Sequence, residues 1–163
     1  MESKEEKTPL TECYTRMTFR LRAALDQRPL AIDLVSAFAS HVDSTDRMFR
    51  HEIVTAFGEA FNNIVIHGYR DRPDGVLDVE AELTPTEMTL RLIDTGHAVD
   101  FGGVIPPDLD SMPERGMGVY MIHALVDEVA YQGGDPNVLS LTKRTSSATT
   151  INQTSQDELR PHG

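Results

Sequence analysis

The chain has 163 residues, of which 39% are hydrophobic and 25% are charged, as in one ordinary globular domain. No apolar run approaches the ~20 residues of a membrane-spanning helix, so no membrane association is expected. Asp and Glu total 26 against 15 Lys and Arg, and this net charge of −11 disfavours direct binding of nucleic acid. A mononucleotide can still be held locally by glycines, a helix N-terminus and a metal ion.

The two ends of the chain carry little apolar surface. Residues 1–12 and 146–163 are polar, and they predict a flexible N-terminal tail and a disordered C-terminal tail around one domain, residues 13–145. The charged first residues lack the apolar stretch of a secretory signal, and the single cysteine, Cys13, cannot form an internal disulfide. These features predict a cytoplasmic protein.

The first half of the domain is expected to hold one strand and two helices. Residues 14–21 alternate between apolar and polar as a strand does, and residues 30–42 repeat apolar positions at helical spacing. A longer helix is predicted over residues 46–67, capped by Ser44 or Thr45 and stopped by the glycine that follows it.

The second half is expected to hold two pairs of strands. Residues 76–83 and 88–93 alternate and predict an antiparallel hairpin. Residues 95–114 are rich in Gly and Pro and too long for an ordinary connection, which indicates a lid or a binding segment. A helix and two strands are then expected at residues 117–126, 128–131 and 138–143. The sum predicts an α+β fold, a two-layer α/β sandwich with a mixed sheet and helices on one face.

Three polar residues lie along one side of the long predicted helix. Glu59, Asn63 and His67 are spaced four residues apart, so they occupy an arc of about 80° beside the apolar stripe. A carboxylate and a carboxamide one turn apart suit a base that accepts a proton and an oxygen ligand for Mg²⁺. Taken alone, the same spacing also fits the solvated side of an amphipathic helix.

Two glycine-containing segments add to this pattern. Asp94 and Gly96 directly follow a predicted strand, where a carboxylate faces a loop and a glycine lets a planar ligand approach the backbone. Residues 115–118, Arg-Gly-Met-Gly, open the third predicted helix and can direct backbone N–H groups at phosphate oxygens. Each segment by itself also fits a simple turn or helix start. The P-loop and the dinucleotide-binding glycine motif are absent from the sequence.

The order of these segments gives the chain a family resemblance. Residues 59–69, Glu-Ala-Phe-Asn-Asn-Ile-Val-Ile-His-Gly-Tyr, resemble the N box of the Bergerat-fold ATPases, the superfamily of gyrase, Hsp90, histidine kinases and MutL. Asp94 and Gly96 fall where that superfamily has its G1 box, and Gly116 and Gly118 fall where it has its G2 box. Over residues 14–144 the chain is most similar to the small anti-sigma factor serine kinases.

The resemblance implies a Bergerat ATP-binding fold and an ATP-dependent serine/threonine protein kinase. Such a protein binds ATP and Mg²⁺, sequesters a sigma factor and phosphorylates a serine of a STAS-type anti-anti-sigma antagonist. It implies that Glu59 is the catalytic base, that Asn63 is the Mg²⁺ ligand and that Asp94 contacts adenine. It also implies backbone contacts to the nucleotide from Gly96, Gly116, Met117 and Gly118. Arg115 would place a cation at the terminal phosphate. The resemblance is also compatible with a homodimer.

Two positions depart from the superfamily pattern. Ala98 stands where many members have a second glycine, and Pro136 and Asn137 stand where a Gly-Thr pair often touches adenine. The Asn137 side chain is the candidate that replaces this contact. The alternative hypothesis is a nucleotide-gated regulatory binding module without kinase activity. The six histidines lack metal-ligand spacing and do not favour a metalloprotein.

Overall fold

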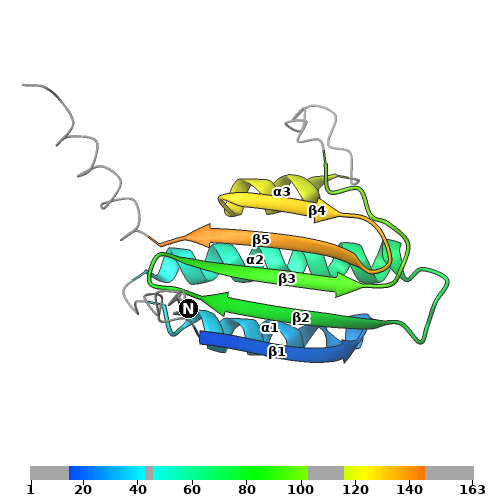
Figure 1. Cartoon of the computed structure of the whole chain (residues 1–163), viewed down its shortest axis with the longest axis horizontal. Coiled ribbons are helices and arrows are strands. Elements are labelled where there is room, and N and C mark those ends of the chain that lie inside the picture. Colours follow the sequence, from blue (N-terminus) through cyan, green and yellow to red (C-terminus); the bar gives the residue numbers. More distant parts are fainter. Residues whose placement is uncertain (1–14, 43–45, 103–115, 146–163) are drawn as a thin grey trace, which may run out of the picture.

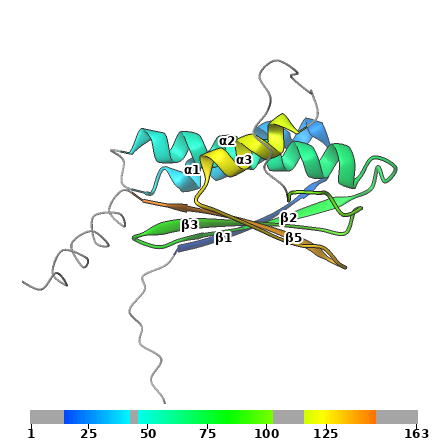
Figure 2. The same ribbon diagram turned by 90° about the horizontal axis from the view of Figure 1, so that it is seen from above.

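The computed structural model describes residues 15–42, 46–102 and 116–145. Both predicted tails, Cys13, Ser44, Thr45 and most of the Gly- and Pro-rich stretch lie outside these residues. The described chain forms a five-stranded sheet with three α-helices packed on one face, which Figures 1 and 2 show from two directions. The predicted α+β sandwich with helices on one face is therefore confirmed.

The elements follow the predicted order. They are β1 (Thr15–Arg22), η1 (Leu25–Gln27), α1 (Arg28–Ala39), α2 (Arg47–Asn63), the π-helical turn η2 (Ile64–Gly68), β2 (Val76–Leu83), β3 (Glu87–Asp94), α3 (Met117–Leu125), β4 (Glu128–Gln132) and β5 (Asn137–Arg144). In the part of the chain that the structure describes, no helix is long and apolar enough to cross a membrane.

The sheet is antiparallel at every strand pair, so the predicted mixed sheet is wrong in this respect. The strand order is β1-β2-β3-β5-β4, and each of the four neighbouring pairs is antiparallel. The connection from β3 through α3 to β4 joins two strands that run in the same direction. They do not pair, because β5 folds back from β4 and lies between them.

The long helix is capped by a different residue from those predicted. Asp46 is the N-cap of α2, and its side chain accepts a hydrogen bond from the Phe49 backbone N–H at 2.8 Å. A carboxylate suits this position because it satisfies an unpaired N–H and faces the positive end of the helix dipole. The helix then runs to Asn63 and widens into the π-helical turn before the chain leaves it at Gly68.

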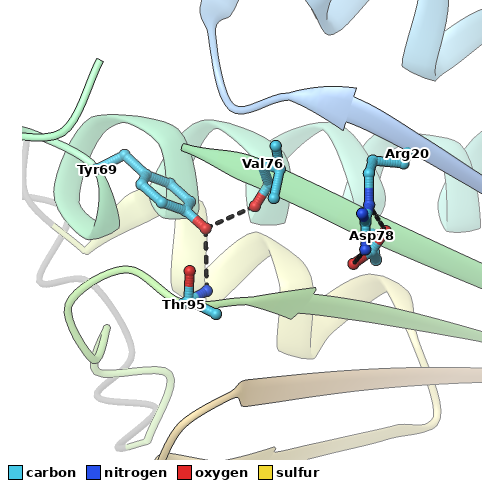
Figure 3. A network of polar contacts seen from close by, with 5 residues as sticks. All are labelled: Arg20, Tyr69, Val76, Asp78 and Thr95. Atoms are coloured by element: carbon cyan, nitrogen blue, oxygen red, sulfur yellow. Dashed lines mark hydrogen bonds and ion pairs between the residues drawn. The ribbon is translucent and has the colours of Figure 1, made fainter. Parts of the chain in front are cut away.

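The core lies between the sheet and the helices. Alternate residues of β2 and β3 are buried, and they meet the apolar stripe of α2, which includes Ile53, Phe57 and Phe61. The opposite face of the sheet carries ion pairs between neighbouring strands, among them Arg20 with Asp78 (Figure 3). Apolar residues repeat every second position in the strands and about every 3.6 positions in the helix. The apolar sides of both therefore meet in one core layer.

One end of the sheet gathers the segments with polar motifs. β3 ends at Asp94, β5 begins at Asn137, and these two residues are register partners across the β3–β5 pair. β2 begins at the same end, because Leu77 is the register partner of Asp94 on the other side. The C-terminal end of α2 reaches this end of the sheet through η2 (Figure 1). The fold thus places the three sequence motifs near one another.

Candidate functional site

The two polar residues of α2 lie against a glycine of α3. A Cβ atom added at Gly118 would lie 2.9 Å from Oε2 of Glu59 and 3.4 Å from Nδ2 of Asn63. The glycine therefore lets the first turn of α3 approach both side chains, which a larger residue would displace. Glu59 and Asn63 come from one sequence motif and Gly118 from another, and the structure brings the three residues together.

The amide nitrogen of Asn63 has no hydrogen-bond partner in the part of the chain that the structure describes. This atom, Nδ2, is buried. A buried polar atom without a partner costs roughly 1–3 kcal/mol, so such atoms are uncommon in folded proteins. Its position beside Glu59 and Gly118 indicates a place for a polar group from outside the described protein.

The start of α3 presents backbone N–H groups for which the described residues show no hydrogen-bond partner. Gly116 is the N-cap, with φ at 107°, and no side chain of the described residues caps the helix. This positive φ favours glycine, and a Cβ atom there would meet nothing within 4 Å. The first N–H groups of a helix have no carbonyl partner within it, and they favour an anion. Met117 and Gly118 supply two of these groups, while Arg115 lies outside the described residues.

Asp94 is almost fully buried, and one of its oxygens has no hydrogen-bond partner among the described residues. Only 4% of its surface is exposed. Its Oδ1 accepts hydrogen bonds from the Gly96 N–H at 2.9 Å and from Nδ2 of Asn137 at 3.0 Å. Its Oδ2 makes no hydrogen bond within the described part of the chain. A buried carboxylate with one free oxygen is a suitable acceptor for an N–H donor of a ligand.

Asn137 directs its side chain to protein atoms. It is 1% exposed, and its Nδ2 also donates to the Gly96 carbonyl at 3.0 Å. Its Oδ1 accepts from the Gly134 N–H at 3.0 Å. The side chain thus holds the turn from Asp94 to Gly96 on one side and the turn before β5 on the other. The sequence identified Asn137, and the structure adds that it contacts Asp94.

Gly96 joins this turn to the end of the helix that carries Asn63. A Cβ atom at Gly96 would lie 2.6 Å from the Gly68 carbonyl oxygen, so only glycine fits. The same carbonyl accepts a hydrogen bond from the His97 N–H at 2.8 Å. His67, the third residue of the predicted polar row, is exposed at the end of the helix.

Two residues that sequence reasoning missed contact the segment after Gly96. Tyr131 accepts a hydrogen bond from the Val99 N–H at 3.1 Å, and its ring centre lies 5.2 Å from that of Phe101. Nε2 of His123 lies 2.8 Å from the Phe101 carbonyl oxygen. A hollow of about 560 Å³ is lined by these residues together with exposed Ala98. No local sequence pattern links these positions.

The arrangement fits a nucleotide with a divalent metal ion. Among the described residues it offers a buried acceptor at Asp94, backbone N–H groups at the start of α3 and an amide nitrogen without a partner at Asn63. In the described ranges no group of three His, Cys, Asp or Glu side chains is positioned to hold a metal ion. A Mg²⁺ ion bound here would therefore depend on phosphate oxygens and water for most of its ligands.

Comparison with known proteins identifies a family. The Histidine kinase-like ATPase domain family matches residues 21–143. The chain is 29% identical over 136 residues to an anti-sigma F factor of Clostridium beijerinckii, covering 79% of this chain and 94% of that protein. It is 31% identical over 118 residues to an anti-sigma F factor of Shouchella clausii, covering 70% of this chain and 80% of that protein.

A solved structure shares the fold. The crystal structure of the RsbU and RsbW domains of a Mycobacterium tuberculosis protein superposes with a TM-score of 0.59 at 22% sequence identity. The match covers 80% of this chain and 32% of that one. At this identity the likeness concerns the fold alone.

Proposed function

Because the chain belongs to the family of histidine kinase-like ATPase domains, we propose that it is an ATP-dependent serine kinase that acts as an anti-sigma factor. The observation that carries the proposal is the contact of Gly118 with Glu59 and Asn63, where the Asn63 amide has no partner among the described residues. The alternative, a nucleotide-gated binding module, shares the nucleotide site and differs in the use of Glu59.

The adenine ring is assigned to the turn after β3. The free Oδ2 of Asp94 accepts a hydrogen bond from the adenine amino group, which guanine lacks at that position. Gly96 leaves the backbone open to the ring. Asn137 was expected to contact the nucleotide directly. We assign it instead to Asp94, because its carboxamide is already engaged by protein atoms.

The phosphates are assigned to the start of α3. Backbone N–H groups of Met117 and Gly118 point out of the helix N-terminus, and the positive φ of Gly116 opens the turn before it. Arg115 directly precedes these residues in the sequence and supplies a cation for the terminal phosphate. The carboxamide oxygen of Asn63 would be the protein ligand for Mg²⁺, which would offset the negative charge of the phosphates when bound.

Glu59 is assigned as the base. Its carboxylate, beside Gly118, accepts the proton of the partner's serine hydroxyl as that oxygen forms a bond to the γ-phosphorus. The bond from phosphorus to the bridging oxygen of ADP breaks, and ADP leaves with the electron pair. The remaining groups orient the phosphates and offset charge, because phosphoryl transfer asks for positioning more than for reactive side chains.

The partners are proposed from the relatives. Anti-sigma F factors match most of this chain, and their name indicates a sigma factor as one partner. The serine substrate is then proposed to lie on an anti-anti-sigma protein of the STAS type. A homodimer and a cytoplasmic location belong to the same proposal.

Mg-ATP binding tests the first step. Titration with Mg-ATP should raise the melting temperature, by the equivalent of ~2.7 kcal/mol at 100 times the dissociation constant, and EDTA should reduce the effect. Asn63→Ala should abolish the rise, whereas Asn62→Ala, one position away on α2, should retain it. A wild-type protein that shows no rise with Mg-ATP contradicts the proposal.

Phosphoryl transfer tests the second step. Glu59→Gln keeps the size of the side chain but replaces the proton-accepting carboxylate with a neutral carboxamide. With a candidate antagonist and labelled ATP, this variant should bind nucleotide and fail to phosphorylate the protein. An inactive wild type that nevertheless retains a sigma factor in the presence of ATP favours the binding module.

A further inference from the structure

We propose that Tyr69 is a positioning residue that aligns the turn carrying Asp94 with the end of the helix carrying Asn63. This inference rests on the proposed nucleotide-binding function, and it adds a residue that touches neither adenine nor phosphate in that proposal. Tyr69 follows η2 directly and is only 5% exposed.

The hydroxyl of Tyr69 bridges two strands at the site end of the sheet. It donates a hydrogen bond to the Val76 carbonyl at 2.6 Å and accepts one from the Thr95 N–H at 3.0 Å (Figure 3). Val76 is the first residue of β2, and Thr95 directly follows Asp94 at the end of β3. One oxygen atom therefore fixes the residue next to the proposed adenine acceptor.

The ring itself has little freedom to move. A Cβ atom at Gly75 would lie 2.2 Å from Cδ1 of Tyr69, so the ring packs directly on the Gly75 backbone. The backbone N–H of Tyr69 donates to the Ile64 carbonyl at 3.1 Å, and its carbonyl accepts from the Arg72 N–H at 2.9 Å. The hydroxyl is thus held at a defined position relative to η2.

Two further bonds connect the same pair of segments. Nη1 of Arg72 donates to the Thr95 carbonyl at 2.7 Å, and the His97 N–H donates to the Gly68 carbonyl at 2.8 Å. Together with the Tyr69 hydroxyl, residues 68–72 make three hydrogen bonds to residues 95–97. The turn beyond Asp94 is therefore tied to the chain that continues from Asn63.

This connection lies where a bound nucleotide would span both segments. The proposed adenine acceptor, Asp94, and the proposed metal ligand, Asn63, must contact opposite parts of one molecule. Small displacements between such groups weaken binding and catalysis strongly, because each contact requires a defined geometry. The Tyr69 hydroxyl limits such a displacement. Loss of the hydroxyl should therefore weaken recognition of the base by more than the loss of fold stability accounts for.

Tyr131 provides a matched control. Its hydroxyl also accepts one backbone N–H from the segment after β3, that of Val99, but it comes from β4, and among the described residues no hydrogen bond joins it to η2. Tyr69→Phe and Tyr131→Phe therefore each remove one phenol oxygen that accepts a backbone N–H from the segment after β3. Only the first change loosens the connection to the end of the helix.

The test is calorimetric titration of the full chain with Mg-ATP and with Mg-GTP, accompanied by the melting temperature of each free variant. We expect Tyr69→Phe to weaken Mg-ATP binding about tenfold and to reduce the preference for ATP over GTP. Tyr131→Phe should lower the melting temperature but leave the affinity and the base preference within about twofold. Arg72→Ala removes an exposed member of the same connection, and we expect a smaller change in the direction of Tyr69→Phe.

The outcomes separate this inference from the proposed function. If the wild type binds no Mg-ATP, the proposed function itself fails. If the wild type binds Mg-ATP and Tyr69→Phe melts earlier with unchanged affinity and base preference, the role of Tyr69 is structural and the inference is overturned. If Tyr69→Phe does not fold, unchanged base preference in Arg72→Ala overturns it.

Discussion

Asn137 and Asp94 face each other across the β3–β5 pair, and Nδ2 of Asn137 lies 3.0 Å from Oδ1 of Asp94. The carboxamide donates its second N–H to the Gly96 carbonyl, so one side chain fixes both the carboxylate and the turn after it. This leaves Oδ2 of Asp94 as the oxygen available to a ligand. The orientation of the proposed adenine acceptor therefore depends on a residue of the neighbouring strand.

Replacement of Asn137 tests this dependence. Asn137→Ala removes three hydrogen bonds and leaves buried Asp94 with one fewer donor. We expect the free energy of unfolding to fall by about 1–3 kcal/mol and Mg-ATP binding to weaken, measured by urea denaturation and calorimetry. Ser140→Ala, a control on the same strand, should change neither quantity appreciably. Unaltered nucleotide affinity in Asn137→Ala would show that Asn137 does not support nucleotide binding.

A pair of glycine substitutions distinguishes packing against the site from backbone conformation. Gly118→Ala places a Cβ atom 2.9 Å from the Glu59 carboxylate, which must move, while alanine favours the helix by about 0.8–1.0 kcal/mol. We expect this variant to be as stable as the wild type and to lose phosphoryl transfer to the antagonist.

The second substitution of the pair, Gly116→Ala, should lower stability where Gly118→Ala does not. Gly116→Ala meets no atom of the described residues within 4 Å, but alanine is strained at a φ of 107°. We expect Gly116→Ala to destabilise the fold by about 1–2 kcal/mol in urea denaturation. An equally destabilised Gly118→Ala would show that its activity loss comes from the fold rather than from Glu59.

The sequence predicted those parts of the fold that follow from local periodicity. The alternation of residues 76–83 and 88–93 identified the β2–β3 hairpin, and the apolar stripe identified α2, because both patterns arise within one element. The cap at Asp46 was missed, since Ser44, Thr45 and Asp46 all satisfy the same preference. The strand order was not predicted, because β5 enters the sheet between β3 and β4 through long-range pairing.

The candidate site was predictable where a motif carried it and not where distant residues support it. Glu59, Asn63, Asp94 and Gly118 were identified from short patterns, and the fold places them at one end of the sheet. The role of Tyr69 depends on a bond to Thr95, 26 positions away. Such a contact has no spacing rule, so only the folded structure reveals it.

The sheet face opposite the helices predicts the acid dependence of stability. The Arg20 guanidinium donates two hydrogen bonds to Asp78, at 2.6 Å and 2.8 Å, and holds the pKa of that carboxyl below its usual value of about 3.9 (Figure 3). Arg16 lowers the pKa of Glu82 in the same way. Because the folded state binds these protons less readily than the unfolded state, the contribution is complete above the usual pKa values. It is lost as the pH falls from about 4 through the lowered values.

We therefore expect the free energy of unfolding, measured in urea from pH 7 to pH 2, to decrease below about pH 4. Asp78→Asn should reduce that decrease, because the variant has no proton to take up at position 78. Asp74→Asn, an exposed control in the turn before β2, should leave the slope of the acid limb unchanged. Each exposed pair contributes little at high ionic strength, so the difference between wild type and Asp78→Asn should shrink in 1 M salt. An acid limb that is identical in wild type and Asp78→Asn at low salt would show that the Arg20 contact does not persist in solution.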